Sequence, residues 1–245
     1  MSLEFLRRTP LFAITLIAGL LSCAPACADG VLVFGGTGRL GAATVNQLIA
    51  AGEKVTVFAR PTSDRGRLAG LDVSFVVGDM LNADDVAAAF TTVMPRIVID
   101  ASALYNGSHE PAVRNIVAGA QAVKVEQIIH HGSVGAGDNM ALFPEIDFSA
   151  LEATLRDKGR AEDVLINSGL TYTIIRNGLL DNDDSKSTGR ARLTQDPAAL
   201  GRITRLDLAA VTMECFAAAR CANKIFHALD DNLAVNLPSE PRAGP

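Results

Sequence analysis

Residues 31–41, Val-Leu-Val-Phe-Gly-Gly-Thr-Gly-Arg-Leu-Gly, decide the fold of this chain. The apolar run from Val31 to Phe34 predicts a buried strand, which stops at a cluster of glycines. From Ala42 to Ala51 the apolar residues recur at the spacing of a helix. A strand, a glycine-rich turn and a helix in this order are the context in which a glycine pattern predicts phosphate binding.

The glycines of this turn fit G-x-x-G-x-x-G at 35, 38 and 41, and also G-x-G-x-x-G at 36, 38 and 41. Gly35 allows a tight turn, Gly38 lets the backbone approach a phosphate, and Gly41 lets the helix pack closely on the strand. The helix N-terminus would then hold a pyrophosphate; the alternative is a turn that binds nothing. The residues predicted to contact a dinucleotide here are Gly35, Thr37, Gly38, Arg39, Leu40 and Gly41.

Short apolar runs and helical stretches continue to alternate along the chain. This pattern predicts an α/β fold: a single Rossmann-type, doubly wound parallel sheet with helices on both faces and a small C-terminal substrate region. Further strands are expected at 54–59, 73–77, 96–100, 125–131 and 171–175, and helices at 82–92, 110–123 and 149–168.

The alternation breaks after Arg176. Residues 177–201 are rich in Asp, Ser, Gly and Pro and show no clear period, which predicts an excursion that shapes a substrate pocket. Beyond it we expect a helix at 207–219, an edge strand at 223–229 and a loose tail at 237–245. The Rossmann domain is therefore expected over residues 29–236.

The first 28 residues have the features of an export signal peptide. Their apolar core is too short for a membrane span, which needs about 20 apolar residues. We expect a periplasmic or secreted protein, or a lipoprotein anchored through Cys23; a misassigned start site would instead leave it cytoplasmic. The signal comprises the basic pair Arg7-Arg8, which partly fits a twin-arginine signal, the apolar core Leu11 to Leu21, the lipoprotein-like Leu20-Leu21-Ser22-Cys23 and the cleavage site Ala26-Cys27-Ala28.

Composition limits the partners and the cysteine chemistry. The 245 residues have a formal net charge of −5 and no basic cluster after the signal, which excludes nucleic acid or an anionic membrane as the main partner. A small-molecule substrate and a monomer or homodimer are expected. Cys215 and Cys221 would remain after cleavage. On one helix and its exit they would lie about 9 Å apart, beyond the reach of a disulfide, so both are expected to be core residues.

Ligands of open parallel sheets bind beyond the carboxyl ends of the strands, so the residues that follow each strand are informative. Arg60 follows the second strand, where NAD enzymes place a carboxylate, and this favours the 2′-phosphate of NADP over NAD. The alternative for Arg60 is a solvated surface cation. Asp79 is expected to accept from the adenine amino group or to cap a helix, with Met80 beside it. The small residues Ala101 and Ser102 let the backbone lie close to the cofactor.

Two polar residues are candidates for the reacting end. Ser133 follows the fifth strand and is expected to orient a carbonyl substrate. Lys158, on the long helix after that strand, is expected to position the cofactor and to assist proton donation, or else to pair with Glu162 on an exposed helix face. His130 and His131 face opposite sides of a strand, so at least one of them packs in the core, and partner ligands for a metal are missing.

These residues together resemble the atypical short-chain dehydrogenase/reductase superfamily, in its NAD(P)H-binding, NmrA-like branch. The resemblance covers about residues 30–230 and implies the Rossmann fold and cofactor binding. Classical members place a tyrosine four residues before the lysine, where this chain has Thr154, and many relatives have Arg-Pro-Gly where this chain has Arg176-Asn177-Gly178. The matching segments are the glycine turn 35–41, Arg60, Gly78-Asp79, Lys158 with Ala161-Glu162, the run 168–176 and Arg205-x-Asp207-Leu208-Ala209.

The resemblance implies a catalytic role for Lys158 by position, as in the isoflavone reductase group. We therefore expect an NADP-dependent oxidoreductase that transfers hydride between nicotinamide and a small carbonyl, enone or quinone-like substrate. The alternative is a non-catalytic NADP-binding redox sensor or assembly factor, which the absence of tyrosine at 154 favours. An epimerase is disfavoured, because only about seventy residues follow the sixth strand, too few for a large sugar-nucleotide pocket.

Overall fold

The computed structural model describes residues 30–105, 107–183 and 186–234. They form one α/β unit in which strands and helices alternate for most of the chain. The strands are β1 (Val31–Phe34), β2 (Val55–Ala59), β3 (Val73–Val77), β4 (Ile97–Asp100), β5 (Gln127–Ser133), β6 (Tyr172–Asn177), β7 (Leu179–Leu180), β8 (Arg192–Thr194), β9 (Arg202–Ile203) and β10 (Lys224–Leu229). The helices are α1 (Arg39–Ala50), α2 (Ala83–Val93), α3 (His109–Val123), α4 (Glu152–Ile166) and α5 (Arg205–Cys215).

The main sheet has eight strands in the order β3-β2-β1-β4-β5-β6-β10-β8. All neighbouring pairs are parallel except β10 and β8. The order reverses between β1 and β4, and the carboxyl ends of these two strands are the switch point where a doubly wound sheet binds its ligand. The predicted Rossmann-type fold is confirmed.

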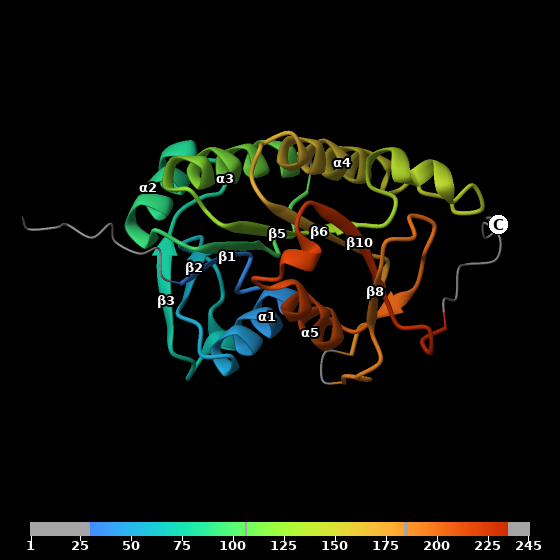
Figure 1. Ribbon diagram of the computed structural model, residues 1–245, viewed down its shortest axis with the longest axis horizontal. Helices are drawn as coiled ribbons and strands as arrows, with labels where there is room; N and C mark the ends of the chain where they lie inside the picture. The colour runs from blue at the N-terminus through green and yellow to red at the C-terminus, as the bar shows by residue number, and fades with distance from the viewer. Residues whose placement is uncertain (1–29, 106, 184–185, 235–245) are drawn as a thin grey trace, which may run out of the picture.

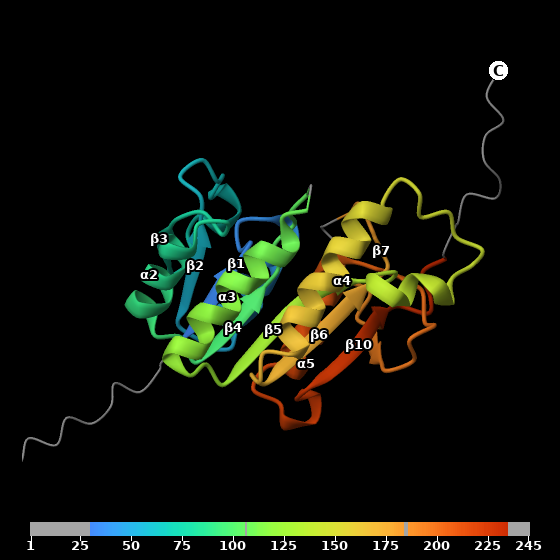
Figure 2. The ribbon, with the colours of Figure 1, turned by 90° about the horizontal axis from the view of Figure 1, so that it is seen from above.

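Helices cover both faces of the sheet (Figure 1). One face packs against α2, α3 and α4, which lie side by side when the sheet is viewed from above (Figure 2). The opposite face packs against α1 and α5. Successive residues of a strand point to opposite faces, so Leu32 and Phe34 enter the first core while Val31 and Val33 enter the second. Because both faces are covered, the central strands are apolar almost throughout.

The predicted excursion over 177–201 is largely irregular, but it also contributes to the sheet. Its residues Arg192–Thr194 return as β8 and pair with β10 in antiparallel register. The prediction that 223–229 is an edge strand is therefore wrong, because β10 lies between β6 and β8. A strand of three residues with polar members gives no recognisable period in the sequence.

The prediction that Cys215 and Cys221 cannot form a disulfide is also wrong. The helix predicted to reach residue 219 ends at Cys215, after which Phe216 is extended and Ala217 has a φ of 52°. The chain folds back on itself, so the two Cα atoms lie 5.4 Å apart and the cysteines are bonded. Both are buried, as expected. The separation of about 9 Å was expected for a continuous helix, but the helix ends before Ala217 and the chain reverses there.

Several predictions lie outside the described residues. They are the export signal at 1–28, with Cys23 and the cleavage site, and the tail at 237–245. Among the residues that the structure does describe, no helix is long and apolar enough to cross a membrane.

Candidate functional site

The turn between β1 and α1 needs its glycines for steric reasons. Gly35 has a φ of 72°, and a Cβ atom there would lie 2.6 Å from the backbone of Ala101 and Ser102. A Cβ atom on Gly41 would lie 2.1 Å from the carbonyl oxygen of Gly35. The turn is therefore compressed between its own helix and the loop after β4. Gly38, in contrast, is exposed, so the backbone is open to a ligand at the middle of the turn.

The N-terminus of α1 faces this opening without a protein group to neutralise it. Among the described residues no side chain caps α1, and its first turn contains no acidic residue. Three other helices are capped: α2 by Asn82, α5 by Thr204, and α3 by Asp157 of α4, which accepts from the backbone N–H of His109 at 2.8 Å. An uncapped helix N-terminus next to an exposed glycine fits a bound pyrophosphate.

The ends of β2 and β3 bring together a cation and apolar surface. The guanidinium of Arg60 is exposed and makes no hydrogen bond or ion pair with the described residues, whereas Arg65 stacks on Phe75 at 4.3 Å. Val77, the last residue of β3, and Leu81, just beyond it, are among the few exposed large apolar residues of the described part of the chain. The exposure of these two side chains was not predictable from the sequence, because it depends on the tertiary arrangement.

Asp79 and Met80 have structural roles in the same turn. The Asp79 carboxylate accepts from the backbone N–H of Leu81 at 2.9 Å, and Asp85 accepts from the N–H of Asp79 at 2.9 Å. The cap of α2 is Asn82, so Asp79 shapes the turn rather than capping the helix. Met80 is buried, and its carbonyl accepts from Asn115.

The loop after β4 is fixed by its own strand. The N–H of Ala101 donates to the carbonyl of Phe34 at 3.0 Å, and the N–H of Ser102 donates to the Asp100 carboxylate at 3.0 Å. These bonds hold the loop against Gly35. Ala101 and Ser102, both predicted to contact the cofactor, therefore lie beside Gly35 of the glycine turn.

Asp100 and His130 form a buried pair that the sequence did not reveal. They are register partners on β4 and β5, and Asp100 Oδ2 lies 2.9 Å from His130 Nδ1. Both side chains are almost fully buried. Burial alone would raise the pKa of Asp100, but the hydrogen bond and charge of His130, with the bonds from Ser102, lower it to about 2. The carboxylate is ionised at neutral pH, so His130 Nδ1 carries the proton of the hydrogen bond.

His131 points to the other face of the sheet, as predicted. Its Nε2 lies 3.3 Å from Thr212 Oγ1 of α5. Burial, together with the nearby charge of His130, lowers the pKa of His131 to about 3. His131 is therefore a neutral core residue, and His130 belongs to the α3–α4 face.

Lys158 lies on α4 and is largely covered rather than exposed. Burial lowers its pKa, and the charges of Asp100 and Glu162 oppose that shift. The alternative of a surface pair with Glu162 is not formed, because no carboxylate of the described residues lies within ion-pair distance of Lys158. Glu162 instead binds Arg176 of β6 at 2.5 Å. Gly132 makes room for that pair, since a Cβ atom there would lie 2.2 Å from Glu162.

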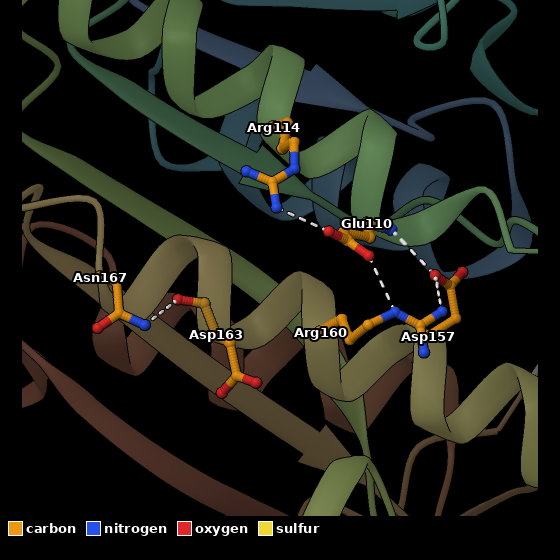
Figure 3. A network of polar contacts seen from close by, with 6 residues as sticks. All are labelled: Glu110, Arg114, Asp157, Arg160, Asp163 and Asn167. Carbon is orange, nitrogen blue, oxygen red and sulfur yellow. Dashed lines mark hydrogen bonds and ion pairs between the residues drawn. The ribbon is translucent and has the colours of Figure 1, made fainter.

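A polar network joins α3 and α4 and fixes the turn of helix that carries Lys158 (Figure 3). Arg160 binds Glu110 of α3 at 2.9 Å and Asp157 at 3.0 Å. Asp157, the neighbour of Lys158, is buried and caps α3. Asp163 lies on the exposed side of α4. The position of Lys158 along the sheet is thus set by contacts on both sides of it.

Ser133 ends β5 beside Asn177 of β6, with which it is in register. It is half-buried, as is Thr154 on α4. Both strand ends open toward the excursion. Arg39 connects the excursion to the glycine turn, because its guanidinium donates to the carbonyl of Asn182 at 2.6 Å.

Asp207 anchors the excursion, which explains the Arg205-x-Asp207 motif. The buried carboxylate accepts from the hydroxyls of Ser187 and Thr204 and from the backbone N–H groups of Thr188 and Gly189, at 2.5 to 3.0 Å. Burial would raise the pKa of Asp207, but these bonds outweigh it and lower the pKa to about 2. The segment 187–189 is therefore bound to the N-terminus of α5.

Comparison with known proteins places the chain in a family. A family model described as NAD(P)H-binding matches residues 35–219. An anaerobilin reductase of Escherichia coli O157:H7 superposes with a TM-score of 0.75 at 27% identity, over 84% of this chain and 98% of that chain.

Curated proteins also match. The chloroplast protein TIC 62 of Pisum sativum is 28% identical over 207 residues, which are 73% of this chain and 38% of that protein. A putative dihydroflavonol 4-reductase of Synechocystis is 33% identical over 123 residues, 45% of this chain and 34% of that protein. The chain thus spans about a third of the length of these curated relatives. The chain belongs to the NAD(P)H-binding family, in the atypical short-chain dehydrogenase/reductase, NmrA-like class that its sequence resembles.

Proposed function

We propose that this protein is an NADP-dependent reductase that transfers hydride to a conjugated carbonyl, enone or quinone-like small molecule. One observation carries the proposal. The glycine turn, the uncapped end of α1, Lys158 and four exposed large apolar side chains belong to the segments at the carboxyl ends of the strands. These apolar residues are Val77, Leu81, Tyr105 and Leu179, which end or follow β3, β4 and β6.

The residues present fit a dinucleotide. The backbone of residues 38–41 would bind the pyrophosphate, and Ala101 and Ser102 would line its other side. Arg60 would bind the 2′-phosphate, and the absence of a carboxylate at the end of β2 supports NADP over NAD. Asp79 has a second carboxylate oxygen that could accept from the adenine amino group. The reduced nicotinamide would supply the hydride.

Lys158 and Ser133 are the polar groups proposed for the reacting end. The hydroxyl of Ser133 would donate to the substrate oxygen and orient it. The ammonium of Lys158 would stabilise the negative charge that develops on that oxygen, an effect that is stronger in a site shielded from water. The aliphatic hydroxyl of Thr154 is a much weaker acid than a phenol, so it does not replace the tyrosine that donates a proton in classical members.

The exposed apolar side chains near the carboxyl ends of the strands support a substrate with an extended apolar skeleton. Tyr105, in the loop after β4, and Leu179, at the start of β7, are exposed and add apolar surface beside the expected substrate position. The similarity to an anaerobilin reductase and to a putative dihydroflavonol 4-reductase supports a reductase function, because both proteins are named as reductases.

The test is oxidation of NADPH with a panel of enones, quinones and linear conjugated pigments. We expect turnover with at least one class, and Lys158→Ala should lower kcat by about 100-fold, because a preorganised charge at the reacting oxygen is lost. Arg156→Ala, which removes a cation from the exposed side of the same helix, should leave kcat unchanged. Tight NADPH binding without turnover on any class would overturn the proposal.

A non-catalytic NADP-binding sensor or assembly factor is the second candidate, and the threonine at 154 favours it. Such a protein would bind a partner only with the cofactor present, and Lys158→Ala would leave that binding intact. Lys158→Ala therefore separates the two candidates: a reductase loses turnover, whereas a sensor keeps its cofactor-dependent partner binding.

We also propose that the protein is exported. The signal-like segment at 1–28 supports this location, and so does the disulfide between Cys215 and Cys221, since structural disulfides form in oxidising compartments. Its partner would be a small molecule, with the chain acting as a monomer or homodimer.

A further inference from the structure

β4 ends in a charged residue although the rest of the strand is apolar. Asp100 follows three buried apolar residues, and its own side chain is almost fully buried. Asp100 and His130 are also the last residues through which β4 pairs with β5. β5 continues to Ser133 beside β6, so the loop that follows Asp100 has no backbone ladder on the β5 side. Other bonds must fix the direction in which the chain leaves the sheet.

Two backbone N–H groups fix the start of this loop. The N–H of Ala101 donates to the carbonyl of Phe34 on β1 at 3.0 Å. The N–H of Ser102 donates to Asp100 Oδ1 at 3.0 Å, a local bond that Asp side chains commonly form in turns. The loop packs so closely on the glycine turn that a Cβ atom on Gly35 would lie 2.6 Å from its backbone. The bond to Asp100 thus helps to set the spacing between the two segments that are predicted to contact the dinucleotide.

His130 holds the Asp100 carboxylate in the orientation that this bond requires. Its Nδ1 donates to Asp100 Oδ2 at 2.9 Å, so both carboxylate oxygens are engaged and the group cannot rotate without losing a bond. The His130 side chain makes no other hydrogen bond with the described residues, since its Nε2 is buried and unpartnered. The single bond of this buried imidazole therefore goes to the carboxylate that fixes the loop.

We propose that His130 is a positioning residue for cofactor binding: acting through Asp100, it fixes the backbone of Ala101 and Ser102 against the glycine turn, at the spacing that the dinucleotide requires. The inference rests on the proposed function, which places the cofactor between these two segments. Both side chains of the pair are buried, so they act on the cofactor only through the loop.

The alternative is that the pair only joins β4 to β5. The backbone ladder already joins these strands from Ile97 to Asp100, so a side-chain bond at its last pair adds little to the sheet itself. A pair that only stabilised the sheet would contribute to the unfolding free energy and would not affect the affinity for a dinucleotide. The two roles are therefore separable by measurement.

The affinity of full-length variants for NADPH tests the positioning role. His130→Leu removes the donor to Asp100 and should weaken NADPH binding by about tenfold or more, because the loop loses the bond that orients its anchor. His130→Asn should restore binding to within about threefold of the wild type, since the asparagine nitrogen lies at the same point of the side chain as Nδ1 and donates in its place. Nicotinamide fluorescence gives the Kd, and urea unfolding gives the stability of each variant.

His131→Leu is the matched control. It is the same substitution one residue along β5, on the opposite face, and it removes a buried ring that contacts Thr212 of α5. It should lower the unfolding free energy but leave the NADPH affinity unchanged, because no hydrogen bond of its ring among the described residues reaches the loop after β4. Equal losses of affinity in the two leucine variants, or no loss in His130→Leu, would overturn the proposal.

A second measurement needs no variant, so it decides the question even if His130→Leu fails to fold. In the wild-type protein, NMR should show a Ser102 amide that is protected from hydrogen exchange and a His130 ring that carries its proton on Nδ1. Addition of NADPH should shift both resonances, since the loop contacts the cofactor. A Ser102 amide that exchanges like an exposed one, a proton on Nε2 alone, or resonances that NADPH does not shift would contradict the positioning role.

These outcomes are distinguishable from a failure of the reductase function. NADPH binding that His130→Leu weakens, without turnover of any substrate, would overturn the reductase function and leave the role of His130 intact. Turnover of NADPH by the wild type, with an unchanged Kd in His130→Leu, would overturn only the role of His130.

Discussion

At the scale of residues, Arg60 is the side chain that we propose selects NADP over NAD. Its guanidinium is exposed at the end of β2 and is not paired with the described residues, so it is available to a 2′-phosphate. Its position was predictable from the sequence, because a residue that directly follows an apolar strand has a fixed place in this fold. Its lack of a partner could be read only from the structure.

We expect Arg60→Ala to weaken NADPH binding by about tenfold or more, because a charged hydrogen bond to the 2′-phosphate is lost. The affinity for NADH, which lacks that phosphate, should change little, and NADH is thus the internal control. Both affinities can be measured by the quenching or enhancement of nicotinamide fluorescence. Equal losses for the two cofactors would show that Arg60 does not read the 2′-phosphate.

Asp100 and Asp207 show why other site residues escaped prediction. Asp100 ends an apolar strand and was visible as such, but its partner His130 is thirty residues away and becomes a neighbour only through the pairing of β4 with β5. Asp207 belongs to a recognised motif, yet its contacts at 187–189 come from the irregular excursion. Long-range hydrogen bonds of this kind leave no periodic signal in a sequence.

At the scale of elements, the longer helices and the central strands were predictable, and the short strands were not. α3 was predicted to within a residue, because an amphipathic stretch of fifteen residues has a clear period. β7, β8 and β9 have two or three residues each and are held by their neighbours rather than by their own sequence. The end of α5 was missed for a different reason, because the chain reverses at Ala217, an alanine with a φ of 52° where the sequence has no glycine or proline to mark the turn.

The disulfide at that reversal joins the end of α5 to the segment that leads into β10. We expect the Cys215→Ala/Cys221→Ala double variant to lose about 2 kcal/mol of unfolding free energy, the chain-entropy value for so short a loop. Urea unfolding with and without a strong reductant measures this loss. The wild-type protein should respond to the reductant and the double variant should not. Equal unfolding free energies for the two proteins would show that the bond adds no stability.

At the scale of the whole molecule, the parallel sheet brings all the candidate groups to one edge. The helices α2, α3 and α4 cover one face and α1 and α5 the other, so the carboxyl edge remains for a ligand. The excursion, anchored at Asp207, borders this edge.

We expect the mature protein isolated from its native cell to lack residues 1–28, or to begin at a lipidated Cys23, and to contain the Cys215–Cys221 disulfide. Intact-mass spectrometry before and after reduction and alkylation tests both features. A chain that begins at Met1 with freely alkylated Cys215 and Cys221 would contradict export. Cofactor retained in the native mass would additionally show which dinucleotide the protein binds in its cell.

The sequence by itself determined the Rossmann fold, the glycine turn and the family, because these depend on local periodicity and on glycines that no other residue can replace. The tertiary structure decided the rest. It showed that the two cysteines are bonded, that β10 is an inner strand, and that Asp100 pairs with His130. These features depend on where the chain reverses and on which strands pair, and packing across the whole sheet sets both.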